Sequence, residues 1–282
     1  MLIASLSLPL VFLAVIVWSR EESVWMNLVP SNKTTLVLGD SHAEPLELPQ
    51  GITIASSGDP FFMPFFHLQR IMMNSRGDGH LNRVVLTVGP HNFSRQPEAR
   101  FSDKHSKWHS GNQRRIANAF TLSDHFHYWN LPHLKLECLK QELYIFDKAI
   151  HDKPTKWNEK PVLNPNKGLN RIHRHRLHEP DWFVHKGIQM EYLMKMIDAC
   201  KIHQLNLVLA ETPIHETYKR HIAPSGWTTY RRTLDSIAKV HEHVSFINFE
   251  QHHWPDSLFK DADHLNSTGG RILGKELEQY TF

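Results

Sequence analysis

The sequence predicts an α/β fold in which a parallel β-sheet carries helices on both faces. Short, continuously apolar runs recur along the chain, and longer helical patterns separate most of them. Strands that are buried on both faces have such continuous apolar runs, whereas half-exposed strands alternate with polar residues. Hydrophobic residues make up 40% of the 282 residues, which is enough to build the core of one large domain.

The predicted strands are five apolar segments, at residues 34–39, 51–55, 83–88, 205–210 and 244–249. Helical patterns lie at residues 60–74, about 115–150, 183–203, 228–241 and 267–280. Because helices connect successive strands, the strands should be parallel. We therefore expect one α/β domain over residues 34–282, preceded by a linker at residues 21–33.

Residues 1–20 differ in composition from the rest of the chain, because Leu2 to Trp18 contains no charged residue. As a helix this segment would span roughly 26 Å, close to the ~30 Å hydrocarbon layer of a bilayer. Trp18 and Trp25 are of the residue type that lies at membrane interfaces. We predict an N-terminal transmembrane helix with the remaining domain outside the cytoplasm. A cleaved signal peptide and a buried helix are the alternatives.

Residues 152–180 interrupt the alternation of strands and helices. They are rich in lysine, asparagine, histidine and proline, and residues 171–176 read Arg-Ile-His-Arg-His-Arg. We expect an inserted surface loop here. It is either a solvated basic segment, or a lid or contact for an anionic glycan or lipid head group.

Charge and metal-ligand patterns exclude some classes of function. The net charge of +3, from 32 basic and 29 acidic residues, gives no indication of a nucleic-acid partner. Paired histidines such as His173 and His175 lack the i, i+4 spacing with a carboxylate that is typical of a helical zinc site, so no metal or other cofactor is predicted. Cys138 and Cys200 lie in apolar stretches and should be buried thiols, with a single disulfide as the alternative.

The chemistry of the chain is concentrated at two short segments. Gly39-Asp40-Ser41 follows the first predicted strand, where open α/β sheets bind ligands, and a helix after Ser41 would direct backbone N–H groups at a developing oxyanion. Near the C-terminus, Asp261 and His264 are three residues apart and can share a face. A serine hydroxyl needs such a histidine as base, oriented by a carboxylate. Asp263 is a second candidate partner for His264, and all of these residues could instead serve only in capping or turns.

Together, Gly39-Asp40-Ser41 and Asp261-x-x-His264 resemble the first and last conserved blocks of the SGNH (GDSL-type) hydrolase superfamily. The resemblance implies a three-layer α/β/α sandwich with a flavodoxin-like sheet. It implies that Ser41 attacks the carbonyl, that His264 transfers the proton, and that Asp261 orients His264. It also implies an oxyanion hole made by the Ser41 N–H, a glycine matched by Gly58, and an asparagine.

The asparagine block departs from the pattern of that family. The family has Gly-x-Asn-Asp, whereas this chain has Gly89-Pro90-His91-Asn92. His91 stands where the family has asparagine, and Asn92 comes one residue later. Both side chains can donate a hydrogen bond, so we assign the third donor to Asn92 and keep His91 as the alternative.

The expected function is O-acyl transfer or ester hydrolysis, with acetyl as the expected group and a cell-envelope glycan as substrate. An anchor followed by an SGNH-like domain is similar to the layout of envelope proteins that modify polysaccharides, often beside a membrane-bound O-acyltransferase. The alternatives are an esterase for lipids or small esters, and a non-catalytic partner of an acyltransferase that retains the fold.

Overall fold

The computed structural model describes residues 32–55, 61–74, 80–97, 167–249 and 251–280. These residues form a five-stranded sheet in which every paired strand is parallel, and the strand order is β2-β1-β3-β4-β5. This confirms the α/β class. The same order occurs in flavodoxin-like doubly wound sheets, which bind ligands beyond the carboxyl ends of their strands.

The strands lie close to the ranges that the apolar segments predict. They are β1 (Thr35–Gly39), β2 (Gly51–Ala55), β3 (Arg83–Val88), β4 (Asn206–Glu211) and β5 (Val244–Ile247). In the centre of the sheet, Leu36, Val37 and Leu38 of β1 are fully buried. Leu36 and Leu38 belong to one hydrophobic cluster and Val37 to another, so successive side chains of β1 point to opposite faces of the sheet.

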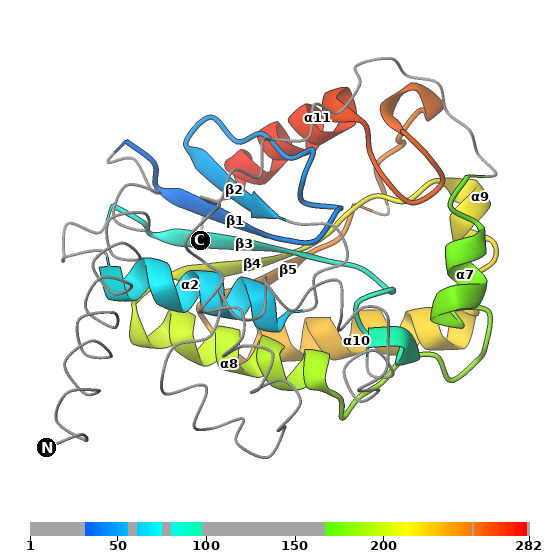
Figure 1. Ribbon diagram of the computed structural model, residues 1–282, viewed down its shortest axis with the longest axis horizontal. Helices are drawn as coiled ribbons and strands as arrows, with labels where there is room; N and C mark the ends of the chain where they lie inside the picture. The colour runs from blue at the N-terminus through cyan, green and yellow to red at the C-terminus, as the bar shows by residue number, and fades with distance from the viewer. Residues whose placement is uncertain (1–31, 56–60, 75–79, 98–166, 250, 281–282) are drawn as a thin grey trace, which may run out of the picture.

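Helices cover both of these faces (Figure 1). Three helices lie on one face, namely α2 (Phe62–Asn74), α8 (Ile188–Ile202) and α10 (Pro224–Val240). The C-terminal helix α11 (Ser267–Gln279) lies on the other. Helix α10 begins earlier than its pattern predicts, with Pro224 in its first turn. Backbone N–H groups in the first turn have no acceptor within the helix, so a proline, which lacks this group, is tolerated there. Helix α8 begins later, at Ile188, because Gly187 before it has an extended backbone.

Part of the predicted loop at residues 152–180 is helical, which corrects that prediction. Residues 170–175 form the short helix α7 (Asn170–His175), which ends at Arg176 in the left-handed conformation with a φ of 56°. Ile172 and Leu177 are buried in the main hydrophobic cluster. This packing holds the segment against the domain. Residues 152–166 lie outside the described residues.

Two further short elements follow the strands, α9 (Glu216–Lys219) and the 3-10 helix η2 (Asp256–Leu258). Within the described ranges, no helix is long and apolar enough to cross a membrane. The predicted anchor at residues 1–20, the linker at residues 21–31 and the predicted helix at about 115–150 lie outside those ranges.

Helix α11 approaches the segment after Ser41 very closely. A Cβ atom on Gly270 would lie 1.9 Å from the carbonyl oxygen of Pro45, and one on Gly274 would lie 2.2 Å from that of Glu47. Only glycine allows the helix backbone to pack directly on the turn. The helix therefore holds both the nucleophile turn and the loop that carries His264, which immediately precedes it.

Candidate active site

The nucleophile candidate lies at the carboxyl end of a central strand. Ser41 follows β1 after Asp40 and is partly exposed. Residues 41–45 form consecutive turns, in which the Ala43 N–H donates to the Asp40 carbonyl at 3.0 Å. The helix expected after Ser41 is therefore absent from this described segment, and that part of the prediction was wrong. Any anion stabilisation by backbone N–H groups must come from the turn.

Three side chains from the two ends of the domain meet here. Ser41 Oγ lies 2.8 Å from His264 Nε2, and His264 Nδ1 lies 2.9 Å from Asp261 Oδ1. An ionised carboxylate can only accept, so Nδ1 carries the proton that it donates to Asp261. The lone pair of Nε2 then faces the serine hydroxyl. This is the geometry that a general base and its orienting carboxylate require.

The loop that holds Asp261 and His264 is fixed by its own hydrogen bonds. Besides the imidazole, Asp261 Oδ1 accepts the backbone N–H groups of His264 at 3.0 Å and Asp263 at 3.2 Å. Asn266 caps α11 by accepting the Gly269 N–H at 2.9 Å. The three-residue spacing thus lets one carboxylate hold both the backbone and the ring of His264.

A cation that the sequence analysis did not identify completes this side of the site. Arg171 of α7 pairs with Asp261, at 3.2 Å between Nη2 and Oδ2, and also with Asp263. Burial alone would raise the pKa of Asp261, but its contacts with His264 and the Arg171 guanidinium outweigh burial and lower that pKa to about 2. The only sequence signal was the basic run at residues 171–176, which does not show which arginine faces inward.

On the other side of Ser41, Asp40 is a buried carboxylate that accepts several hydrogen bonds. Its Oδ1 accepts from the backbone N–H of His42 and from His42 Nδ1, each at 3.0 Å. Its Oδ2 accepts from His91 Nε2 at 2.6 Å and from Asn92 Nδ2 at 3.1 Å. Burial would raise the pKa of Asp40, but its contacts with His91 and His42 hold it well below its usual range. Asp40 therefore carries a fixed negative charge next to the nucleophile.

His42 lies between two other imidazoles. Its ring stacks on His91 with centroids 4.2 Å apart and on His264 with centroids 4.4 Å apart. Burial, reinforced by the neighbouring His91 and His264, lowers the pKa of His42 to about 3. His42 is therefore neutral at physiological pH. Its Nδ1 donates to Asp40, and its Nε2 has no hydrogen-bond partner among the residues that the structure describes. The stack supports the face of the His264 ring and so restricts its rotation.

The two candidates for the third oxyanion donor, Asn92 and His91, differ in burial. Asn92 is buried, with its Oδ1 accepting the Gly89 N–H at 2.8 Å and one amide N–H directed at Asp40. His91 is more exposed and also donates to Asp40. Both side chains thus contact the turn that carries Ser41, because each donates a hydrogen bond to the carboxylate of Asp40. Gly58 lies outside the described residues.

Two groups of side chains at this site have ligand atoms within 4.8 Å of one another, Asp40 with His42 and His91, and His42 with Asp263 and His264. In each group two imidazoles are stacked, with planes inclined by only 19° or 25°. The lone pairs of two stacked imidazoles lie in nearly parallel planes, so a single ion between the rings would lie out of the plane of both and would be poorly placed for the in-plane coordination that metals require. These residues fit a hydrogen-bonded network better than a metal site.

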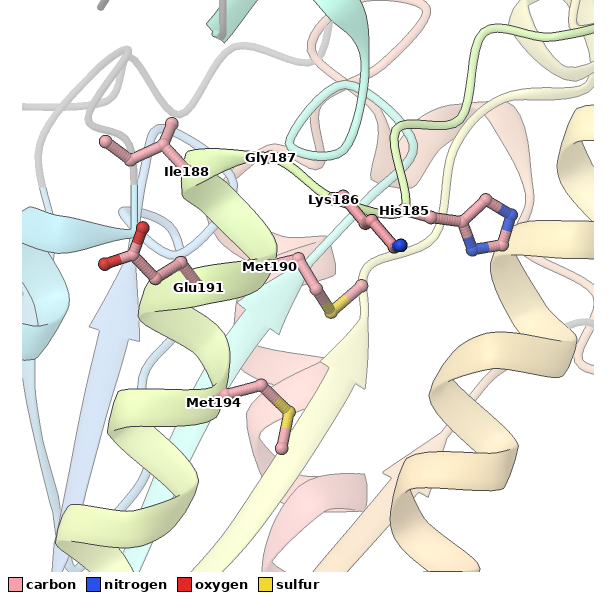
Figure 2. A pocket seen from close by; sticks show the side chains of 7 residues that line it. All are labelled: His185, Lys186, Gly187, Ile188, Met190, Glu191 and Met194. Carbon is pink, nitrogen blue, oxygen red and sulfur yellow. The ribbon is translucent and has the colours of Figure 1, made fainter.

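A hollow of about 510 Å³ lies beside the N-terminal turns of α8 (Figure 2). Its lining combines the cation Lys186 with the apolar side chains of Ile188, Met190 and Met194. Among the described residues, its lining includes none that the sequence assigned to catalysis. The lining of this hollow therefore does not include Ser41, His264 or Asp261.

Comparisons with known proteins add little beyond the geometry. No protein-family model matches the chain, and no curated protein matches it. Among solved structures, the chain is similar to one titled "The structure of a putative platelet activating factor from Streptococcus pneumonia", with a TM-score of 0.45 and 11% sequence identity. The match covers 99% of this chain and 99% of the other.

Proposed function

We propose that the chain is a serine-dependent esterase or acyltransferase of the SGNH type. The observation that carries this proposal is the contact of Ser41 Oγ with His264 Nε2, together with that of His264 Nδ1 with Asp261. The parallel sheet supports it, because the nucleophile follows a central strand at its carboxyl end. A protein that had lost catalysis would have no need to keep the hydroxyl, ring and carboxylate in this alignment.

The arrangement fits a two-step acyl transfer. Ser41 Oγ attacks the ester carbonyl while His264 Nε2 takes the hydroxyl proton, and Asp261 stabilises the resulting imidazolium. The C–O bond to the leaving alcohol then breaks, and His264 returns the proton to that alcohol. Water or a sugar hydroxyl next attacks the acyl-serine with His264 again as base, which regenerates Ser41.

The oxyanion of the tetrahedral intermediate needs preorganised donors. We assign this role to the Ser41 N–H, to Gly58 and to Asn92, with His91 as the alternative to Asn92. Asn92 has two amide N–H donors, and the hydrogen bond to Asp40 accounts for one of them. Replacement of the true third donor by alanine should lower kcat by about 10²–10³-fold with a small effect on KM. Comparing Asn92→Ala with His91→Ala identifies that donor.

For the substrate, we propose an O-acyl group, acetyl in the first instance, on a cell-envelope glycan. The apolar segment at residues 1–20 supports this, because an anchor would keep the site at a membrane surface and outside the cytoplasm. A membrane-bound O-acyltransferase is the proposed partner that supplies the acyl group. An acetyl donor and an oligosaccharide acceptor, followed by mass spectrometry of the sugar, distinguish transfer from hydrolysis. A rate that rises with acyl-chain length and ignores the sugar would instead indicate a lipid or small-ester esterase.

The serine mechanism is tested with a fluorophosphonate probe and with p-nitrophenyl acetate. The wild-type chain should be labelled at Ser41 and should release acetate, whereas Ser41→Ala should do neither. Ser257→Ala is the matched control, since Ser257 is exposed in η2 and should retain full activity. Equal labelling and equal rates for wild type and Ser41→Ala would refute the proposed function.

A further inference from the structure

The part of the candidate site around His264 contains further charged groups besides Ser41, His264 and Asp261. Two carboxylate oxygens approach His264 Nδ1, namely Asp261 Oδ1 at 2.9 Å and Asp263 Oδ1 at 3.3 Å. Both acidic side chains are nearly fully buried. An imidazolium formed next to two unneutralised carboxylates would be stabilised by both of them.

Arg171 offsets this excess of negative charge. Its guanidinium contacts both oxygens of Asp261, at 3.3 Å and 3.2 Å, and also pairs with Asp263. Its Nη1 lies 3.1 Å from His264 Nδ1, so the cation sits directly beside the ring that takes the proton. Asp261, Asp263 and Arg171 together therefore carry a single negative charge, as one carboxylate alone would.

The placement of Arg171 is built into the fold. Ile172 of helix α7 and Leu177 just after it are buried in the hydrophobic core, and the Ala262 N–H donates to the Lys167 carbonyl at 3.0 Å. These contacts connect the segment before α7 to the loop between Asp261 and Asp263. The arginine side chain is only 24% exposed. A solvated surface arginine would not be held in this way.

We propose that Arg171 is a positioning residue for the catalytic base. It holds the Asp261 carboxylate against His264 and cancels the charge of Asp263. His264 can then accept the proton of Ser41 and release it to the leaving alcohol. This inference rests on the proposed function, because it assigns a role in proton transfer from Ser41.

Other ionisable groups surround this cluster. They are His42 in the imidazole stack, and Tyr218, Lys260, Lys167, Arg174 and Glu44 from the neighbouring segments. His42 and Tyr218 stay neutral near pH 7, because burial lowers the pKa of the first and raises that of the second. All six groups are unchanged in the Arg171 and Asp263 variants compared below, so differences between these variants report on Arg171 and Asp263.

The test measures the rate of Ser41 labelling by a fluorophosphonate in the full-length chain, from about pH 5 to about pH 9. Arg171→Met removes the charge and leaves two carboxylates, so the midpoint of the acid limb should move up by roughly one pH unit. Asp263→Asn leaves Arg171 paired with Asp261 alone, so the midpoint should move down. The double variant restores a single negative charge, and its midpoint should return close to that of the wild type.

Two controls separate this role from a structural one. Arg171→Lys keeps the charge and should recover most of the wild-type midpoint, although it cannot make the two-pronged contact with Asp261. Arg174→Met removes an exposed cation from the same helix and should leave the profile unchanged. Circular dichroism confirms that each variant is folded, and Asp263→Asn keeps the test decisive if Arg171→Met does not fold.

The outcomes distinguish this inference from the proposed function. A uniform loss of rate at every pH, with unmoved midpoints in Arg171→Met and Asp263→Asn, would overturn the role of Arg171 while Ser41 remained the nucleophile. A double variant that kept the midpoint of Arg171→Met would also overturn it. Absence of any Ser41-dependent labelling in the wild type would refute the proposed function itself.

Discussion

Ser41 Oγ lies 2.8 Å from His264 Nε2, although 223 residues separate the two along the chain. The turn after β1 supplies the hydroxyl, and the loop before α11 supplies the ring. Helix α11 packs on the turn through Gly270 and Gly274, and it begins just after His264. One helix therefore sets the distance between nucleophile and base.

The first prediction concerns the base. His264→Asn should lower kcat for p-nitrophenyl acetate by about 10²–10⁴-fold, because the hydroxyl of Ser41 would lose its proton acceptor. Steady-state kinetics measure this loss. His253→Asn is the control, since His253 is an exposed histidine of the same region and should have wild-type kinetics. Wild-type activity in His264→Asn would remove this histidine from the mechanism.

The second prediction separates the two acidic neighbours of His264. Asp261 accepts the Nδ1–H at 2.9 Å and also two backbone N–H groups, whereas Asp263 Oδ1 lies at 3.3 Å. Asp261→Asn should therefore reduce kcat at pH 8 by roughly 10²-fold or more, and Asp263→Asn by no more than about tenfold. Both variants take one partner from Arg171, so they form a matched pair. The reverse order of effects would assign the orienting role to Asp263.

The third prediction is a loss of stability in acid that depends on His42. The pKa of His42 is about 3 in the folded protein and 6.5 in its ordinary state. Between these values the unfolded chain binds more protons than the folded one, so the free energy of unfolding falls as the pH drops from about 6.5 towards 3. For this group the slope is at most about 1.4 kcal/mol per pH unit.

Urea unfolding of wild type and His42→Asn at several pH values checks this slope. Asparagine can keep a donor near the position of Nδ1 but does not titrate, so its stability should depend less on pH between about 6.5 and 4. Asp40, whose pKa is also lowered, contributes a further loss at more acidic pH in both proteins. Parallel curves for the two proteins would show that His42 is not the titrating group.

The fourth prediction concerns the glycine before the nucleophile turn. A Cβ atom on Gly39 would lie 1.9 Å from Thr87 Oγ1 and 2.9 Å from the Cβ of Ala43. Gly39→Ala should therefore destabilise the protein by about 1–3 kcal/mol and displace Ser41. Thermal unfolding measures the first effect and fluorophosphonate labelling the second. Adding Thr87→Ala should recover only part of the stability, because the contact with Ala43 remains.

The sequence by itself determined the elements whose signal is local. Apolar runs such as residues 83–88 predicted β3 with the right bounds, because strands buried on both faces need no partner to be recognised. The spacing of Asp261 and His264 was also informative, because the interaction between these two residues is local. Their hydrogen bonds form within one loop, so three residues of separation already bring carboxylate and ring together.

Only the tertiary structure decided what surrounds that pair. Arg171 reaches Asp261 from 90 positions away, and nothing in the basic run at residues 171–176 distinguishes it from its neighbours. The stack of His91, His42 and His264 likewise depends on two turns and one loop that meet at one edge of the sheet. The sequence also suggested a helix after Ser41 where the structure has turns. Such contacts follow from the packing of distant segments, and local periodicity in the sequence does not predict them.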